Sequence, residues 1–123
     1  MIRGTTHTIK FDCIDIIDTV DAVQEIEVTV YQENNATANI RRLYTDDACY
    51  IDDKTKIIST VLTPEDTLKF NTKKKATVQL RVLMADHAGN PYILGNYIQM
   101  ITVYPTQSES FFEVDFLGGV ANG

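Results

Sequence analysis

The stretch from Ala76 to Met84, ATVQLRVLM, alternates apolar side chains with mostly polar ones. The stretch from Ile26 to Val30, IEVTV, repeats this alternation, with Ile and Val separated by Glu and Thr. A period of two places one set of side chains on a buried face and the other toward water or a partner. Two strands with polar outer faces therefore predict an antiparallel all-β domain.

The length and composition of the chain indicate one ordinary globular domain. The chain has 123 residues, of which 44% are hydrophobic and 23% are charged. A chain of this length buries roughly 65% of its unfolded surface, which is enough for one two-layer core. This composition argues against disorder of the whole chain.

Charge and cysteine content limit the partners and the compartment. The net charge of −6 disfavours nonspecific binding to nucleic acid, which needs a basic face. Cys13 and Cys49 match no metal-binding spacing and predict reduced thiols in a cytoplasm. The residues after Met1 lack the apolar core of a signal peptide, and no apolar run reaches membrane-spanning length. We therefore expect neither a nucleic-acid partner nor a membrane partner.

Strand and turn signals follow one another at short intervals up to Pro105. The expected strands are residues 5–11, 23–33, 39–45, 48–51, 56–62, 76–84 and 92–104. This spacing predicts an antiparallel immunoglobulin-like β-sandwich of about seven strands, with one short helix before the sixth strand. Gly89 or Asn90 is expected at a positive φ in the last hairpin, and Gly95 predicts a bulge. Residues 1–105 should form the sandwich and residues 106–123 a C-terminal tail.

The helix before the sixth strand has a clear N-terminal signal in Thr63-Pro64-Glu65-Asp66. Thr63 can cap the helix, Pro64 suits its first position, and Asp66 completes a shortened capping box. We expect one or two turns that end near Phe70, with Leu68 or Phe70 filling the core.

Four aspartates recur every third residue in the connection between the first two strands: Asp12, Asp15, Asp18 and Asp21. In a helix or a tight turn, such carboxylates could hold a hard cation such as Ca²⁺. The spacing is not that of an EF-hand, so we favour a solvated acidic connection.

Nucleophiles and bases are few and scattered. His87 lies in a polar hairpin loop and His7 lies near the start of the chain, and neither has an evident catalytic partner. Cys13 and Cys49 are expected to be small buried hydrophobes. The sequence contains no nucleophile elbow, no metalloprotease helix and no phosphate-binding loop. It therefore predicts a noncatalytic protein with no cofactor, catalytic site or metal site.

The C-terminal tail carries large apolar side chains on a short segment. It either folds back on its own domain or docks onto a neighbouring chain by strand addition or by aromatic anchors. The main candidate contact residues are Phe111, Phe112, Phe116 and Leu117. The secondary candidates are the basic residues Arg41, Arg42, Lys73, Lys74 and Lys75, which could also be plain solvated side chains.

Three separate stretches resemble small proteins of tailed bacteriophages and prophages of Gram-positive gut bacteria. They are Met-Ile-Arg-Gly-Thr-Thr at residues 1–6, Leu-Thr-Pro-Glu-Asp-Thr-Leu-Lys-Phe at residues 62–70, and Val-Gln-Leu-Arg-Val-Leu at residues 78–83. Residues 62–67 are also similar to the turn before the sixth strand of an antibody variable domain, but the chain has no Trp and residues 76–84 contain no Cys. His7 stands where the phage proteins usually have a proline, and residues 12–22 also depart from their pattern. The likeness does not cover the tail.

The phage resemblance implies a virion or phage-encoded protein made in a bacterial cytoplasm. We expect a noncatalytic virion structural protein that docks on neighbouring virion proteins and on copies of itself. Capsid decoration, a head–tail connector or neck role, and fibre or baseplate attachment all fit the residues. One alternative is an acidic phage-encoded inhibitor of a host protein. Another is a carbohydrate-binding module, suggested by six tyrosines.

Overall fold

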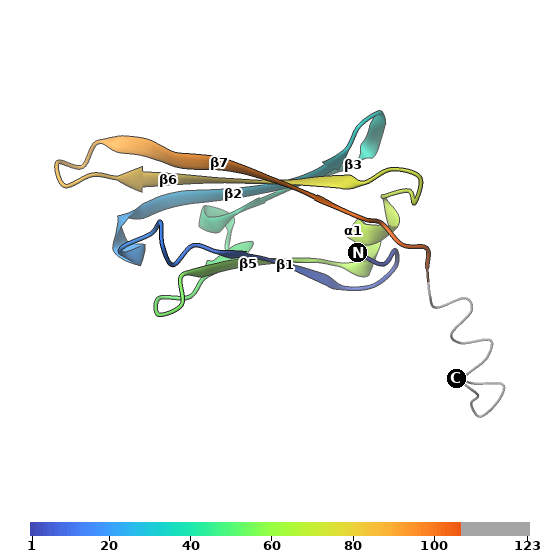
Figure 1. Cartoon of the computed structure of the whole chain (residues 1–123), viewed down its shortest axis with the longest axis horizontal. Coiled ribbons are helices and arrows are strands. Elements are labelled where there is room, and N and C mark those ends of the chain that lie inside the picture. Colours follow the sequence, from blue (N-terminus) through green and yellow to red (C-terminus); the bar gives the residue numbers. More distant parts are fainter. Residues whose placement is uncertain (107–123) are drawn as a thin grey trace, which may run out of the picture.

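The computed structural model describes residues 1–106, and these form mostly antiparallel β-structure in two sheets, as predicted (Figure 1). The strands are β1 (His7–Asp12), β2 (Val23–Gln32), β3 (Asn35–Leu43), β4 (Cys49–Ile51), β5 (Ile57–Leu62), β6 (Ala76–Ala85) and β7 (Pro91–Ile101). One sheet has the order β3-β2-β6-β7 and the other has the order β1-β5-β4. Two short 3₁₀ turns, η1 (Val20–Ala22) and η2 (Tyr44–Asp46), lie between strands.

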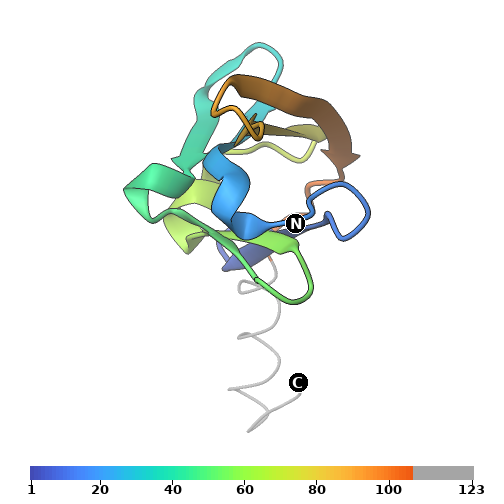
Figure 2. The same cartoon turned by 90° about the vertical axis from the view of Figure 1, so that its left-hand side faces the viewer.

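The two sheets lie in separate layers, and the hydrophobic core fills the space between them (Figures 1 and 2). In the four-stranded sheet, Val28 of β2 lies opposite Leu80 of β6, and both side chains point into the core. Ile58 and Leu62 of β5 contribute from the other layer and are fully buried. Burial alternates along β6 as the period of two predicts.

Helix α1 (Pro64–Leu68) joins β5 to β6 and begins at the predicted capping box. The Asp66 backbone N–H donates to Thr63 Oγ1 at 3.1 Å, and the Thr63 N–H donates to the Asp66 carboxylate at 2.9 Å. The helix ends two residues before Phe70. Phe70 is 1% exposed and fills the core, whereas Leu68 is 47% exposed.

The N-terminal residues are fastened to this helix. Arg3 Nε donates to the Phe70 carbonyl at 2.6 Å, and the Gly4 N–H donates to Thr67 Oγ1 at 2.9 Å. The Thr67 hydroxyl in turn donates to the Thr5 carbonyl at 2.9 Å. The stretches 1–6 and 62–70 therefore form one hydrogen-bonded unit, although they lie far apart in the sequence.

Turn chemistry explains where the observed elements agree with the prediction and where they differ. Gly89 adopts the expected positive φ of 83° in the β6–β7 hairpin. Asn34 has a φ of 56°, so the β2–β3 turn closes within Glu33-Asn34 and β3 begins four residues earlier than predicted. A register shift occurs in the β6–β7 pairing beside Gly95, where a bulge was expected. Within the described residues, no helix is long and apolar enough to cross a membrane.

Candidate docking surface

Strand β7 is an apolar edge strand, and none of its eleven residues is buried. In the described part of the chain it pairs only with β6, so its other edge is open. Five of the eleven large hydrophobic residues that are exposed in residues 1–106 lie on this strand: Tyr92 (45% exposed), Ile93 (53%), Tyr97 (39%), Ile98 (61%) and Met100 (60%). An edge strand of this length and apolar character is a ready template for pairing with another chain.

On its core-facing side, the exposure of β7 is explained by the unequal width of the two sheets. Four strands face three, and Figure 2 shows β3 and β7 at opposite edges of the wider sheet. Tyr97 lies opposite Leu80 in the ladder and is therefore on the core-facing side. Ile98 lies opposite Gln79 and is on the outer side. Both faces of β7 thus present apolar side chains, and only Leu94 and Ile101 pack partly against the core.

A glycine shapes the core-facing side of this strand. A Cβ atom at Gly95 would lie 2.9 Å from the Tyr97 ring, closer than real contacts allow. The absence of a side chain at Gly95 therefore lets the Tyr97 ring lie over its own strand. An aromatic ring placed over an edge glycine is a recognised way of stabilising such a strand.

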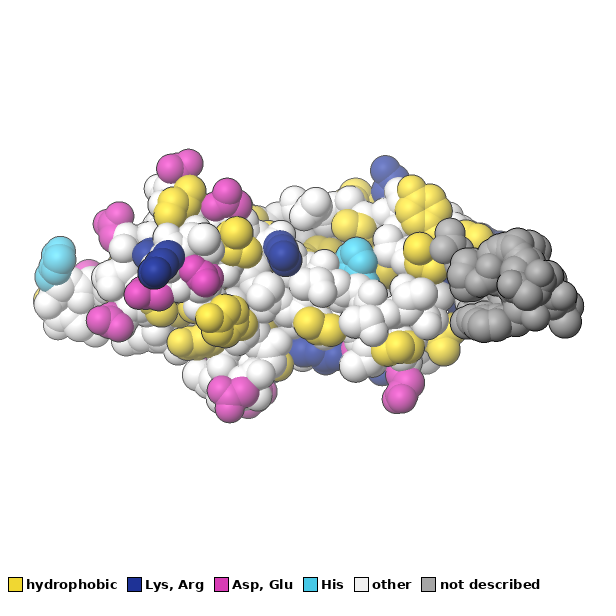
Figure 3. All heavy atoms as spheres, turned by 90° about the horizontal axis from the view of Figure 1, so that it is seen from below, with side chains coloured by type: hydrophobic (Ala, Val, Ile, Leu, Met, Phe, Trp, Pro, Cys, Tyr) yellow, Lys and Arg dark blue, Asp and Glu magenta, His cyan; other side chains and the backbone are white. Residues whose placement is uncertain are grey.

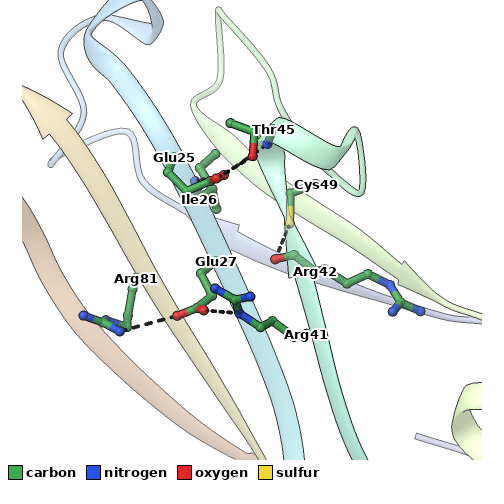
Figure 4. Close-up of polar contacts among 8 residues, drawn as sticks. All are labelled: Glu25, Ile26, Glu27, Arg41, Arg42, Thr45, Cys49 and Arg81. Atoms are coloured by element: carbon green, nitrogen blue, oxygen red, sulfur yellow. Dashed lines mark hydrogen bonds and ion pairs between the residues drawn. The ribbon is translucent and has the colours of Figure 1, made fainter.

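The outer face of the four-stranded sheet carries a charged row beside the apolar edge (Figure 4). Glu27 of β2 accepts from Arg41 of β3 at 2.5 Å and from Arg81 of β6 at 3.5 Å. These residues line a shallow hollow of about 220 Å³ that ends at Ile93 of β7. The hollow is too small and too open to enclose a substrate of ordinary size.

Glu25 on this face and Asp66 at the start of α1 have pKa values below the ordinary range of carboxyl groups. Partial burial alone would raise the pKa of Glu25, but hydrogen bonds from the Thr45 hydroxyl and N–H lower it (Figure 4). Burial likewise opposes ionisation of Asp66, and the Thr63 hydrogen bonds and Arg42 lower its pKa. Both groups are therefore structural anions at neutral pH.

The structure places the predicted basic contact residues in three different settings. Arg41 is exposed and pairs with Glu27, which raises the pKa of its guanidinium. Arg42 is only partly exposed and pairs with Asp66, so it binds β3 to the start of α1. The exposed residues Lys73, Lys74 and Lys75 lie in the loop before β6. The structure does not gather these five residues into one basic patch.

The loop that carries the three lysines is anchored by Gln32, which is 3% exposed. Gln32 Nε2 donates to the carbonyls of Asn71 and Lys74 at 2.8 Å and 2.9 Å. Its Oε1 accepts from the Asn71 N–H at 2.9 Å. These bonds satisfy the buried amide and fix the path of the loop.

The other candidates for chemistry are dispersed. Burial raises the pKa of both Cys13 and Cys49, which are free thiols. Partial burial and the nearby terminal amine lower the pKa of His7. In residues 1–106, no three His, Cys, Asp or Glu side chains come together as a metal site, so the aspartates of the 12–21 connection form none.

The face of the three-stranded sheet looks different from β7. Figure 3 shows its hydrophobic side chains as separate spots among polar groups and backbone. Tyr50 of β4 and Val61 of β5 are exposed there, at 64% and 49%. The two residues line one hollow together with polar neighbours, and a pair of exposed apolar residues in such surroundings is normal on a protein surface.

Sequence reasoning located β7 as a strand but did not identify it as a surface for partners. The available signal was the loss of alternation, because Tyr92-Ile93-Leu94 and Tyr97-Ile98 are apolar on consecutive positions. Such runs occur in strands whose two faces are both covered. The predicted contact residues Phe111, Phe112, Phe116 and Leu117 lie outside the described residues.

Comparison with known proteins adds no relative: no protein-family model matches the chain, and no curated protein matches it significantly.

Proposed function

We propose that this chain is a noncatalytic structural protein of a bacteriophage particle, which docks on neighbouring subunits through β7. The observation that carries the proposal is the strand of eleven residues with apolar side chains on both faces and an open edge. A free protein with such an edge is prone to aggregation, so a partner that covers it is the natural expectation.

The phage resemblance supports the same conclusion from the sequence. Its three stretches have structural roles: residues 1–6 and 62–70 are hydrogen-bonded to each other, and residues 78–83 lie in the buried strand β6. Because the resemblance is confined to residues with structural roles, it supports a shared fold of the kind that a structural subunit needs. A virion presents many copies in symmetric array, so weak contacts at β7 would add up there.

We also propose that the fold is an immunoglobulin-like sandwich. The order β7-β6-β2-β3 corresponds to the G-F-C-C′ sheet of that fold, and β1-β5-β4 corresponds to B-E-D. In this scheme the first three residues replace strand A, because Ile2 forms a parallel bridge with Tyr104 just after β7. Helix α1 occupies the connection between strands E and F.

Mass spectrometry of purified phage particles that encode this chain tests the proposed function. A structural component is present in many copies per particle and stays with the particle through density-gradient purification. An inhibitor of a host protein would be absent from particles and would be recovered with its target from infected cells. A carbohydrate-binding module would show a melting temperature that rises with added glycan. Either of these last two results would contradict the proposal.

A further inference from the structure

We infer that the open edge of β7 accepts residues 111–117 of a second copy of this chain, which add as a fifth strand to the β3-β2-β6-β7 sheet. The inference rests on the proposed function, because it names the partner that covers the docking surface. Strand addition supplies main-chain hydrogen bonds for affinity and side-chain contacts for specificity.

The acceptor strand has the length and character that strand addition requires. Its eleven residues extend over roughly 36 Å, and in the described residues their outer edge has no partner. Tyr92 and Tyr97 lie on the core-facing side, while Ile93, Ile98 and Met100 lie on the outer side, as their partners on β6 show. An added strand would therefore find apolar neighbours on both of its faces.

The donor segment, FFEVDFL, alternates in a way that matches one apolar face of β7. Phe112, Val114 and Phe116 alternate with Glu113 and Asp115, so an extended backbone would carry one wholly apolar face. The segment contains neither Pro nor Gly, and its seven residues would extend over about 23 Å, within the length of β7.

Charge favours the same pairing. Residues 107–123 contain Glu109, Glu113 and Asp115 but no Lys or Arg. The surface hollow beside Met100 of β7 is lined by two basic residues, Lys74 and Lys75, and one acidic residue, Glu33. Acidic side chains of an added strand would therefore meet a net positive charge near the end of β7.

A second copy suits this role better than the same molecule, because the chain is diverted directly after β7. The amino group of Met1 donates to the Thr102 carbonyl at 3.0 Å, and the Tyr104 N–H donates to the Met1 carbonyl at 2.8 Å. Val103 is buried, and Figure 1 shows the chain turning from β7 toward the N-terminus and α1.

The length of the linker makes return to the same β7 unfavourable. Residues 107–110 separate Thr106 from Phe111, and five residue steps reach at most about 18 Å. To reach the open edge of its own β7, the tail would have to reverse direction within this length and pass the N-terminal residues that pair with Thr102 and Tyr104. A neighbouring copy meets no such restriction.

Paired variants of the full chain test the inference by sedimentation velocity over a range of concentrations. The edge variant carries Tyr97→Lys and Ile98→Lys, one change on each face of β7. Its matched control carries Tyr50→Lys and Val61→Lys, which place the same charges at exposed positions on the other sheet. The donor variant carries Phe112→Ser and Phe116→Ser. Circular dichroism confirms that all four proteins, the wild type included, have the same β content.

We expect the wild type and the matched control to self-associate. The edge variant and the donor variant should each associate at least about 100-fold more weakly, because each loses two large apolar contacts. When these two variants are mixed, they should form a one-to-one dimer and nothing larger, because the mixture has one intact donor and one intact acceptor. Only donation between copies predicts this rescue.

Three outcomes would overturn the inference. Undiminished association of the donor variant would show that β7 binds another surface, and the docking function would stand without the tail. A monomeric wild type whose residues 111–117 are protected from hydrogen exchange would show that the tail binds its own β7. A monomeric wild type that lacks this protection and is also absent from purified particles would overturn the proposed function as well.

Discussion

Strands β6 and β7 are adjacent, antiparallel and similarly rich in apolar residues, but they have opposite environments. Five of the ten residues of β6 are buried, and none of the eleven residues of β7 is. Strand β6 lies between β2 and β7, whereas β7 is an edge strand of the wider sheet. The apolar content of a strand therefore does not determine whether it belongs to the core. Whether a strand belongs to the core depends on its position at the centre or at the edge of the sheet.

The sharpest test of this difference is truncation of one side chain on each strand. Leu80→Ala should lower the free energy of unfolding by about 2 to 5 kcal/mol, because Leu80 is 1% exposed and its loss leaves a cavity. Ile98→Ala should change it by less than about 0.5 kcal/mol, because Ile98 is 61% exposed. Urea unfolding measured at a low protein concentration provides both values.

A large effect of Ile98→Ala under those conditions would contradict the comparison. It would mean that the monomer itself buries β7, with residues 107–123 as the segment available to do so. At high protein concentration, the loss of unfolding free energy caused by Ile98→Ala should become larger, whereas that caused by Leu80→Ala should not. The reason is that a second copy covering β7 stabilises the folded state.

The next contrast compares two glutamines that differ in burial. Gln32→Ala should destabilise the fold by about 2 to 4 kcal/mol, because it removes three hydrogen bonds by which a buried amide holds the backbone of Asn71 and Lys74. Gln79→Ala should cost less than about 0.5 kcal/mol, since its bond to Asn96 of β7 is exposed to water. Thermal unfolding of the two variants under identical conditions compares them. Equal losses of stability would show that the Gln79–Asn96 contact is as well shielded from water as the contacts of Gln32 with the loop before β6.

These contrasts indicate what the sequence could and could not reveal. The alternation around Val78 and Leu80 predicted a core strand, and Thr63 with Asp66 predicted a capped helix, because both signals are local in the chain. The exposure of Tyr97, which lies on the core-facing side of β7, depends on how far the opposing sheet extends beneath it. That width is set in part by the pairing of β5 with β1, which is distant in sequence, and no local pattern encodes it.

The basic residues illustrate the same limit. Arg41 and Arg42 are consecutive and chemically identical in the sequence, yet one pairs with Glu27 on the sheet surface and the other with Asp66 on α1. Alternation predicts that they point to opposite sides of β3, but it does not identify the carboxylate that each one meets. That requires the register of β3 against β2 and the position of the helix.

The capped helix before β6 should make the stability of the protein depend on pH. The pKa of Asp66 is lowered by folding, so its contribution is fully present above about pH 5 and is lost as the pH falls below its ordinary value of 3.8. Asp66→Asn should therefore cost about 1 to 2 kcal/mol at pH 7 and much less at pH 3. Urea unfolding of both proteins across this range measures the difference. A difference that stays constant down to pH 3 would show that the charge of Asp66 is unimportant.

The smallest effect is expected on the outer face of the four-stranded sheet. Glu27→Gln removes the charge that joins Arg41 to Arg81, and these two side chains are 62% and 47% exposed. Such pairs contribute little in water, so the loss should be smaller than that of Asp66→Asn. It should also shrink further in 1 M NaCl, where charges are screened within about 3 Å. Unfolding at low and high salt measures both expectations.

The comparison between β6 and β7 would change if Glu27→Gln lowered the free energy of unfolding as much as Asp66→Asn does, and by the same amount at low and high salt. Weak, screened pairing is a property of charges in contact with water, so a strong and salt-resistant pair would mean that water is excluded from this face. The charged row ends at Ile93 of β7, so whatever excluded the water would extend from the edge strand across the sheet. The docking surface would then include the outer faces of β2, β3 and β6, and Arg41 would be one of its contacts.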